Sequence, residues 1–441
     1  MKLFDNAIKP ENFAEQVIWY GIICTYIFYL LGAQPLVVPA IIWFLSLYLA
    51  KKLWQQNDNT PETERINIPP LAWLWVACVA VLLPVLIIAH LDFDVSLVRL
   101  FKSLLKWSRG WAVWALLLLI SSLKIRPKLV YRAITILCIQ SLPAIFLSYL
   151  AFALKFPEYL LVSPLHRFGG DADFYTVFSF IRDGQHNLPR ITLYSPWAPN
   201  LAMMGMVYYF VVRQEKNQKL KFIATIATVI MIVTPLSRTA IVCFPFLILL
   251  TWVLTHLAQP VIYFITGICT FLIGLFSTVI LDFLEVFIAR FHSLRASSSA
   301  VRIALVRISL DRWWNDAPIW GHGFTPPSGS RYTDYLPIGT SGCGTWVNLL
   351  YTKGIVGFSV IFVAIFCTFI DVLRKAQKNP IAKVGLSTML VFLLFSFIEE
   401  LDLLAYIYWP GILVIGLAIQ EKVPSTLPTL SPATENNYKS V

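Results

Sequence analysis

Long apolar runs recur through the chain and constrain its fold more than any other feature. Stretches of about 17 to 25 mostly apolar residues, long enough to cross a bilayer as a helix, begin near residue 16 and continue to residue 420. Hydrophobic residues make up 58% of the 441 residues and charged residues 13%, which exceeds what a soluble domain needs for its core. We therefore expect an all-α, polytopic membrane protein.

The pattern predicts about 12 transmembrane helices in one transmembrane domain, residues 1–422. Two long extracytoplasmic loops are expected at about 156–197 and 283–342, the second of them between helices 9 and 10, and their aromatic and glycine content predicts ordered, functional segments. The Pro-, Ser- and Thr-rich tail, 423–441, is expected to be disordered and cytoplasmic. The twelve spans lie near 16–32, 35–50, 70–90, 107–123, 133–154, 198–212, 221–236, 239–257, 260–281, 343–370, 382–400 and 403–420.

Basic residues gather in alternate connections, which predicts the orientation in the membrane. If the N-terminus is cytoplasmic, four inner connections are basic and both termini lie inside, as the positive-inside rule requires. The net charge of +11 is then explained by these loops, and no nucleic-acid partner is expected. The basic residues of the four inner connections are Lys51, Lys52 and Arg65; Lys124, Arg126, Lys128 and Arg132; Arg213, Lys216, Lys219 and Lys221; and Arg374, Lys375, Lys378 and Lys383.

The seven cysteines have no paired spacing, which argues against a disulfide framework or a zinc site.

Arg238 interrupts the apolar pattern at an expected outer membrane boundary. It lies in Thr234-Pro235-Leu236-Ser237-Arg238, a short connection between two strongly apolar runs. An arginine at this depth is costly and needs a partner. One interpretation is that it snorkels to headgroups or pairs with a carboxylate, and the other is that it binds an anion.

A second arginine, Arg302, follows a serine cluster at residues 297–299. Apolar residues at 301, 305, 308 and 310 predict an amphipathic helix on the outer face, with Ser299 as its N-cap. Arg302 would then lie in the first turn, where free backbone N–H groups also favour an anion. For Arg307 and Arg312 we prefer the interpretation that they contact lipid headgroups.

Several short segments, taken in order, resemble the O-antigen ligase and O-antigen polymerase superfamily of bacterial envelope polysaccharide enzymes. The resemblance covers roughly residues 190–400 and rests on order and topology, because each segment is short and degenerate. The segments are Pro199-Asn200 at the start of a central helix, Ser237-Arg238-Thr239-Ala240, Arg302 after the serine cluster, Pro318-Ile319-Trp320-Gly321-His322-Gly323-Phe324, and the re-entry Leu349-Leu350-Tyr351-Thr352-Lys353-Gly354-Ile355-Val356-Gly357.

The resemblance implies a membrane glycosyltransferase of the bacterial plasma membrane. Such enzymes take a glycan from a polyprenyl (undecaprenyl) diphosphate carrier on the outer face and transfer it to a glycan or lipid acceptor, with no cofactor or metal. Arg238 and Arg302 would bind the diphosphate, a role that suits guanidinium because it pairs bidentately with phosphate and stays charged. Arg190, Asn200 and Cys343 are candidates for the glycan path.

The sequence departs from the family at the position of the acceptor-activating histidine, which is Cys343 here. A thiol is a poor general base near its free pKa of about 8.5. His322, Glu399, Glu400 and Asp402 are the candidate replacements. His322 is equally well explained as a turn residue, and the three acids as counter-ions of the two arginines. The departure slightly favours polymerase over ligase. A lipid-linked glycan or solute transporter, or a flippase, is the alternative function.

Overall fold

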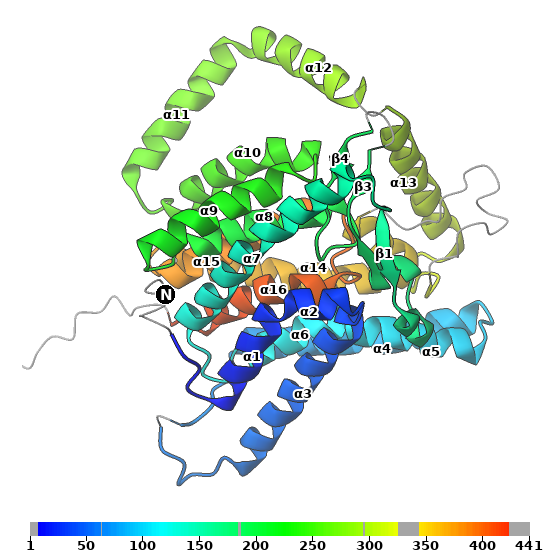
Figure 1. Cartoon of the computed structure of the whole chain (residues 1–441), viewed down its shortest axis with the longest axis vertical. Helices are drawn as coiled ribbons and strands as arrows, with labels where there is room; N and C mark the ends of the chain where they lie inside the picture. Colours follow the sequence, from blue (N-terminus) through cyan, green and yellow to red (C-terminus); the bar gives the residue numbers. More distant parts are fainter. Residues whose placement is uncertain (1–7, 63, 184–186, 294–295, 325–343, 423–441) are drawn as a thin grey trace, which may run out of the picture.

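The computed structural model describes residues 8–422, except residue 63 and the segments 184–186, 294–295 and 325–343. In this part of the chain the fold is mostly helical, and the helices form a bundle whose connections gather at two opposite ends (Figure 1). We call these the N-terminal end and the distal end. Cys343 and the tail 423–441 lie outside the described residues, so the predictions made for them stay predictions.

Six helices, or seven if one bent pair counts as a single span, are long and apolar enough to cross a membrane, by a search of the described residues. The described chain therefore has the helices of a membrane protein. Its helices are α1 (Phe13–Ile23), α2 (Thr25–Leu30), α3 (Gln34–Gln55), α4 (Pro70–Asp92), α5 (Leu97–Arg109), α6 (Trp111–Ile120), α7 (Pro127–Ala153), α8 (Ala198–Val212), α9 (Gln218–Val233), α10 (Arg238–Thr255), α11 (Pro260–Leu275), α12 (Ser277–Ser293), α13 (Ala296–Asp316), α14 (Thr345–Ala376), α15 (Pro380–Phe395) and α16 (Ala405–Gln420).

Every predicted span falls on one of these helices or on a consecutive pair, but the ninth has a different shape from the one expected. Helices α11 and α12 meet at a bend of 80°. Helix α12 also continues to Ser293, so the segment predicted as a loop from residue 283 begins as a helix. Helices α8, α15 and α16 are apolar but only 15–16 residues long. A full set of twelve crossings therefore stays a prediction.

The segment between α7 and α8 adds a few short strands to an otherwise mostly helical fold. It contains strands β1 (Tyr159–Val162), β2 (Thr176–Phe178), β3 (Ile181–Arg182) and β4 (Pro189–Arg190), with 3-10 turns η2 (Pro164–Phe168) and η3 (Ala172–Tyr175) between β1 and β2. The strands form two antiparallel ribbons, β1 with β2 and β3 with β4. Both ribbons lie at the distal end (Figure 1).

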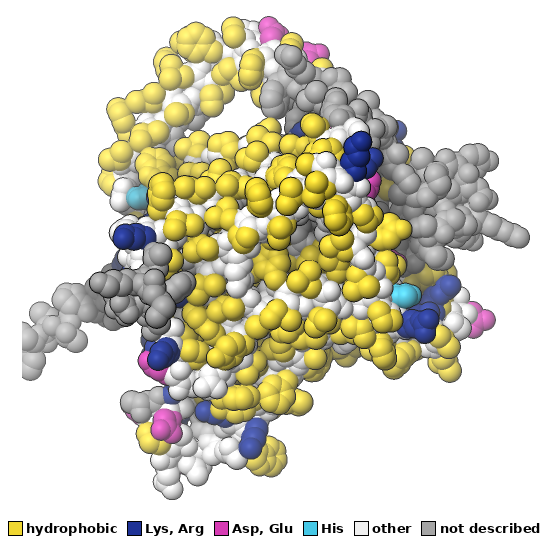
Figure 2. Space-filling model, in the orientation of Figure 1, with side chains coloured by type: hydrophobic (Ala, Val, Ile, Leu, Met, Phe, Trp, Pro, Cys, Tyr) yellow, Lys and Arg dark blue, Asp and Glu magenta, His cyan; other side chains and the backbone are white. Residues whose placement is uncertain are grey.

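Helix α16 lies at the centre of the bundle and is buried along almost its whole length. Small residues let its neighbours approach closely, as is common between membrane helices. A Cβ on Gly385 of α15 would lie 2.3 Å from Ala418, and a Cβ on Gly416 would lie 2.8 Å from Ser121. The outer surface of the bundle is largely hydrophobic on the visible face, and most charged side chains lie toward its edges (Figure 2).

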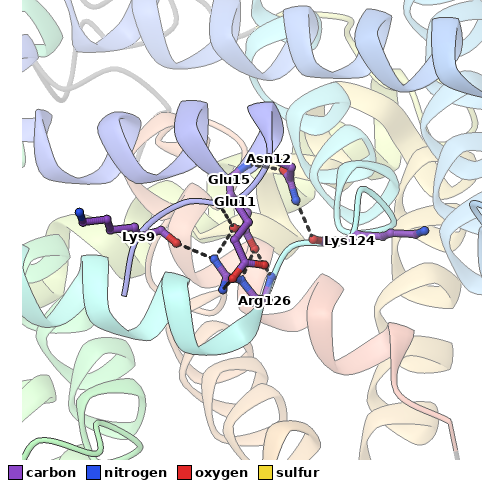
Figure 3. A network of polar contacts seen from close by, with 6 residues as sticks. All are labelled: Lys9, Glu11, Asn12, Glu15, Lys124 and Arg126. Atoms are coloured by element: carbon purple, nitrogen blue, oxygen red, sulfur yellow. Dashed lines mark hydrogen bonds and ion pairs between the residues drawn. The ribbon is translucent and has the colours of Figure 1, made fainter. Parts of the chain in front are cut away.

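At the N-terminal end, Arg126 joins the first segment of the chain to the connection between α6 and α7 (Figure 3). Its guanidinium donates to both carboxylate oxygens of Glu15, at 2.8 and 2.7 Å, and to the Lys9 carbonyl at 2.7 Å. It also pairs with Glu11. The Glu15 side chain is fully buried, so its charge depends on this partner.

Other polar contacts at this end join the connections that were predicted to lie on the cytoplasmic side of the membrane. These connections therefore lie together, as the predicted orientation requires. The contacts are Arg132 with Glu215 at 2.7 Å, Gln420 with Ser122 at 2.6 Å, Asn379 with Glu421 at 2.7 Å, and Gln377 with the Leu254 carbonyl at 2.8 Å.

The two acidic partners of Arg126 allow a matched test of burial. Glu15→Gln should lower the free energy of unfolding by about 3 kcal/mol, because a buried ion pair loses one charge. Glu11→Gln, the same change at a carboxylate whose side chain is 70% exposed, should cost less than about 1 kcal/mol. Thermal unfolding in detergent measures both, and equal losses would contradict the account.

Candidate functional site

The acidic connection between α15 and α16, residues 396–404, is fixed by the first turn of α14. Thr345 donates its backbone N–H to the Ser396 carbonyl at 2.8 Å and its hydroxyl to the Glu399 carbonyl at 2.7 Å. The Leu401 N–H in turn donates to the Thr345 hydroxyl at 3.0 Å. Gly344 has φ +81° and a Cβ there would lie 2.5 Å from the Phe397 carbonyl oxygen, so only glycine fits. The connection therefore holds its carboxylates in set positions.

Glu399 and Glu400 are neighbours in the chain but have different surroundings. Glu400 is 6% exposed and accepts a hydrogen bond from Asn348 Nδ2 at 2.9 Å. Glu399 is half-buried. The pKa of Glu399 is raised to about 7, first because burial disfavours the carboxylate; the charge of Arg302 opposes this rise and that of Glu400 adds to it. A carboxyl with this pKa exchanges protons near neutral pH.

Asn200 approaches Glu399 from the first turn of α8. It is fully buried, and its Oδ1 accepts a hydrogen bond from the Tyr408 hydroxyl at 2.7 Å. Its amide nitrogen lies near enough to Glu399 to lower the pKa of that carboxyl, but outside strict hydrogen-bond geometry. The predicted Pro-Asn start of a central helix thus coincides with the start of α8 and lies beside the acidic connection.

Arg302 reaches the same place from α13. Its side chain is exposed, and its charge acts on Glu399. The chain is already helical from Ala296, so Ser299 lies inside α13 and Arg302 is not in its first turn. The predicted N-cap and the anion-binding first turn are therefore wrong, whereas the proximity of Arg302 to a glutamate fits the counter-ion interpretation and leaves anion binding open.

Arg238 is the first residue of α10 and is half-buried. Ser237 is the N-cap of this helix, with its hydroxyl accepting from the Ala240 N–H at 3.4 Å. Arg190 supports the connection between α9 and α10, because its Nε donates to the Pro235 carbonyl at 2.9 Å. This contact gives Arg190 a structural function next to Arg238, beside its predicted place on the glycan path.

The segment Pro318–Gly323 fills an interruption in α14. Gly354 has φ +62° and ψ −167°, so the helix is broken there although it continues on both sides. The Ile355 N–H donates to the Pro318 carbonyl at 2.9 Å, while the Tyr351 and Thr352 carbonyls accept from the His322 and Gly323 N–H groups at 2.8 and 3.0 Å. Backbone groups freed by the break are thus satisfied within the protein, as a membrane environment requires.

His322 is held tightly inside this contact. Its ring stacks on Tyr351 at 4.3 Å and on Phe93 at 4.9 Å, and Nδ1 lies 3.1 Å from the Tyr351 carbonyl oxygen. Nε2 lies 3.6 Å from the Asp316 carboxylate. Burial lowers the pKa of His322, against the opposing effect of the bond to Tyr351. With 3% of the residue exposed, a substrate hydroxyl does not reach the ring as placed, which favours a structural role.

Sequence reasoning missed Lys106 and Lys353. Lys106 on α5 lies within electrostatic range of Glu400, Asp402 and Asp171, and Lys353, at the break in α14, within range of Lys106 and Asp402. The sequence marks both lysines as unusual. Lys106 is a basic residue in an expected outer loop, where the positive-inside rule does not require one. Lys353 interrupts an apolar re-entry segment.

Asp171 and Asp173 form an Asp-x-Asp pair at the start of η3. Asp171 lies within electrostatic range of Lys106. Among the described residues, no group of three or more His, Cys, Asp or Glu side chains is arranged to bind a metal ion.

No protein-family model matches the sequence, and no curated protein matches it. The function is therefore argued from the site.

The interruption in α14 makes a sharp prediction for glycine. Gly354→Ala should cost about 3 kcal/mol or more, because a Cβ would lie 2.1 Å from the Ile319 carbonyl oxygen in a backbone conformation that alanine rarely adopts. Gly267→Ala, in α11 with nothing within 4 Å of the added atom, should change stability by less than about 1 kcal/mol. Yield and thermal unfolding in detergent compare the two, and a well-folded Gly354→Ala protein would refute the assigned break.

Proposed function

We propose that the protein is a membrane glycosyltransferase that moves a glycan from a polyprenyl diphosphate carrier to an acceptor at the outer face of a bacterial plasma membrane. The observation that carries the proposal is the convergence of Asn200, Arg302 and Glu399 at the distal end, from three segments far apart in sequence. The resemblance to O-antigen ligases and polymerases had singled out Asn200 and Arg302, and Glu399 was a candidate replacement for the family histidine. A cation beside a carboxyl of pKa about 7 suits transfer from an anionic leaving group.

In this proposal the distal end faces outward, the chain crosses the membrane about twelve times, and both termini are cytoplasmic. The polar contacts that gather basic connections at the N-terminal end support this orientation. The polyprenyl tail then lies among lipids, and its diphosphate reaches the level of Arg238 and Arg302.

The chemistry follows from the charges. The Glu399 carboxylate accepts the proton of an acceptor hydroxyl, whose oxygen forms a bond to the anomeric carbon of the donor glycan. The bond between that carbon and the diphosphate oxygen breaks, and the electron pair leaves with the diphosphate. Arg238 and Arg302 stabilise the added negative charge, and Asn200 orients the glutamate. Glu400, paired with Asn348, remains a counter-charge in this scheme.

Polymerisation is slightly favoured over ligation, so the acceptor is a second carrier-linked glycan in preference to a different lipid. The preference rests on Cys343, which stands where ligases have a histidine. Glu399 supplies the missing base in this proposal.

A transporter or flippase is the second candidate, and the break in α14 favours it. Discontinuous helices with charged residues nearby are typical of transporter binding sites, and Lys353 adjoins the break. An enzyme transfers glycan in detergent, whereas vectorial transport needs a sealed compartment, so activity of the solubilised protein separates the two.

The diphosphate role of the arginines predicts that Arg238→Lys and Arg302→Lys each abolish glycan transfer, a loss of about a hundredfold or more, because lysine cannot pair bidentately with phosphate. Arg307→Lys, an exposed arginine of the same helix as Arg302, should leave transfer unchanged. Purified variants with a polyprenyl-diphosphate-linked oligosaccharide provide the assay. Full activity in either of the first two variants would remove the clamp from the mechanism.

The base role of Glu399 predicts how the rate depends on pH. A base must be deprotonated, so with a pKa of about 7 the single-turnover rate should rise about tenfold per pH unit below neutrality and level off above pH 8. Glu399→Gln should lower the rate by about 10² to 10⁴ and remove this dependence. Glu158→Gln, at an acid whose side chain is 42% exposed in the segment between α7 and α8, should retain the profile. An unchanged profile in Glu399→Gln would assign the base elsewhere.

A further inference from the structure

Strand β1 is apolar and exposed on both faces. Successive strand residues point to opposite sides, so a strand that packs on a core normally buries every second side chain. In β1 all four residues, Tyr159 to Val162, are exposed, by 42% to 59%. An edge strand of this composition is an aggregation hazard in water.

The other strand of the ribbon is anchored to the bundle, so the exposure of β1 is not due to a detached hairpin. The Tyr29 hydroxyl of α2 accepts from the Phe178 N–H at 2.7 Å and donates to the Phe178 carbonyl at 3.1 Å. Thr176 and Val177 of β2 are buried. Ser163, the residue after β1, packs so closely against Gly32 that a Cβ added to Gly32 would lie 2.4 Å from the Ser163 Cβ. The ribbon therefore turns β2 inward and β1 outward.

The exposed apolar surface of β1 continues the apolar surface of α7, which is long and apolar enough to cross a membrane. Toward the end of α7, a candidate span, large apolar side chains face outward, and the exposure continues through the connection into β1. The exposed residues of this stretch are Phe146, Leu147, Leu150, Leu154 and Phe156. Charged groups border it: Lys155 is exposed, and Glu158 pairs with Arg182 at 3.4 Å. Apolar side chains flanked by charges match the boundary between lipid tails and headgroups.

We propose that the β1 ribbon rests in the lipid surface of its own membrane, at the headgroup–acyl boundary of the leaflet at the distal end. At this depth water and headgroups satisfy the free edge of the strand, which the hydrocarbon core would not do. The ribbon lies at the end of the bundle opposite the N-terminus (Figure 1). This inference does not depend on the proposed reaction.

Contact with the leaflet would set the depth of the candidate site. The same segment carries Asp171, which interacts with Lys106, and Phe174, whose ring packs against Trp197 at 5.6 Å and Tyr406 at 6.5 Å. A ribbon resting on lipid therefore places these residues, and the acidic connection beside them, close to headgroup level.

Site-specific photocrosslinking tests the contact directly. The full-length protein, with p-benzoylphenylalanine replacing Leu160, is reconstituted into nanodiscs of phosphatidylethanolamine and phosphatidylglycerol, irradiated and examined by mass spectrometry. Phe146 on α7 is the membrane control, and Asp58, exposed in the polar connection between α3 and α4, is the water control. All three positions are on the surface, so the substitutions should leave thermal unfolding unchanged.

We expect a phospholipid adduct at position 160 in a yield similar to that at position 146 and several-fold above that at position 58. An adduct at 146 with none at 160 would overturn the proposal. A chain-to-chain adduct at 160 would also overturn it, because the strand would then be covered by a second copy.

Discussion

The interruption of α14 at Gly354 leaves backbone groups that lipid cannot satisfy, and the way the protein satisfies them shapes the distal end. Segment 318–323 enters the break, supplying donors to the first half of the helix and an acceptor to the second. The fit depends on Gly321, because a Cβ there would lie 2.5 Å from the Gly354 nitrogen. With the break held open in this way, the first turn of α14 is fixed where it binds the connection that carries Glu399 and Glu400.

Much of the architecture was predictable because length and apolar content determine a membrane helix. Each apolar run coincides with one helix or with a consecutive pair of helices. What escaped prediction depends on contacts between distant segments. The bend between α11 and α12 and the ribbons after α7 have no strong local signal. Ser299 resembles an N-cap in the sequence, but α13 already begins at Ala296.

The residues of the candidate site could be predicted only in part, because their contacts also join distant segments. Arg302, Asn200 and Glu399 were named from charge, position and resemblance, and the fold brings them together. His322 was named as a candidate replacement for the family histidine, but its ring lies between Tyr351 and Phe93. No sequence pattern distinguishes a histidine that packs a broken helix from one that moves a proton. Lys106 and Lys353 were recognisable as misplaced charges, and only the fold connects them to the acidic connection.

The distal end thus combines a rigid acidic connection, cations from several helices and a ribbon suited to the lipid surface. The most direct test of the central claim is product analysis after incubating purified, detergent-solubilised protein with a polyprenyl-diphosphate-linked oligosaccharide. The account predicts longer carrier-linked chains, or a glycan moved to a different acceptor if the enzyme is a ligase. An unchanged substrate in detergent, together with movement of the same lipid across sealed vesicles, would contradict it and identify a transporter.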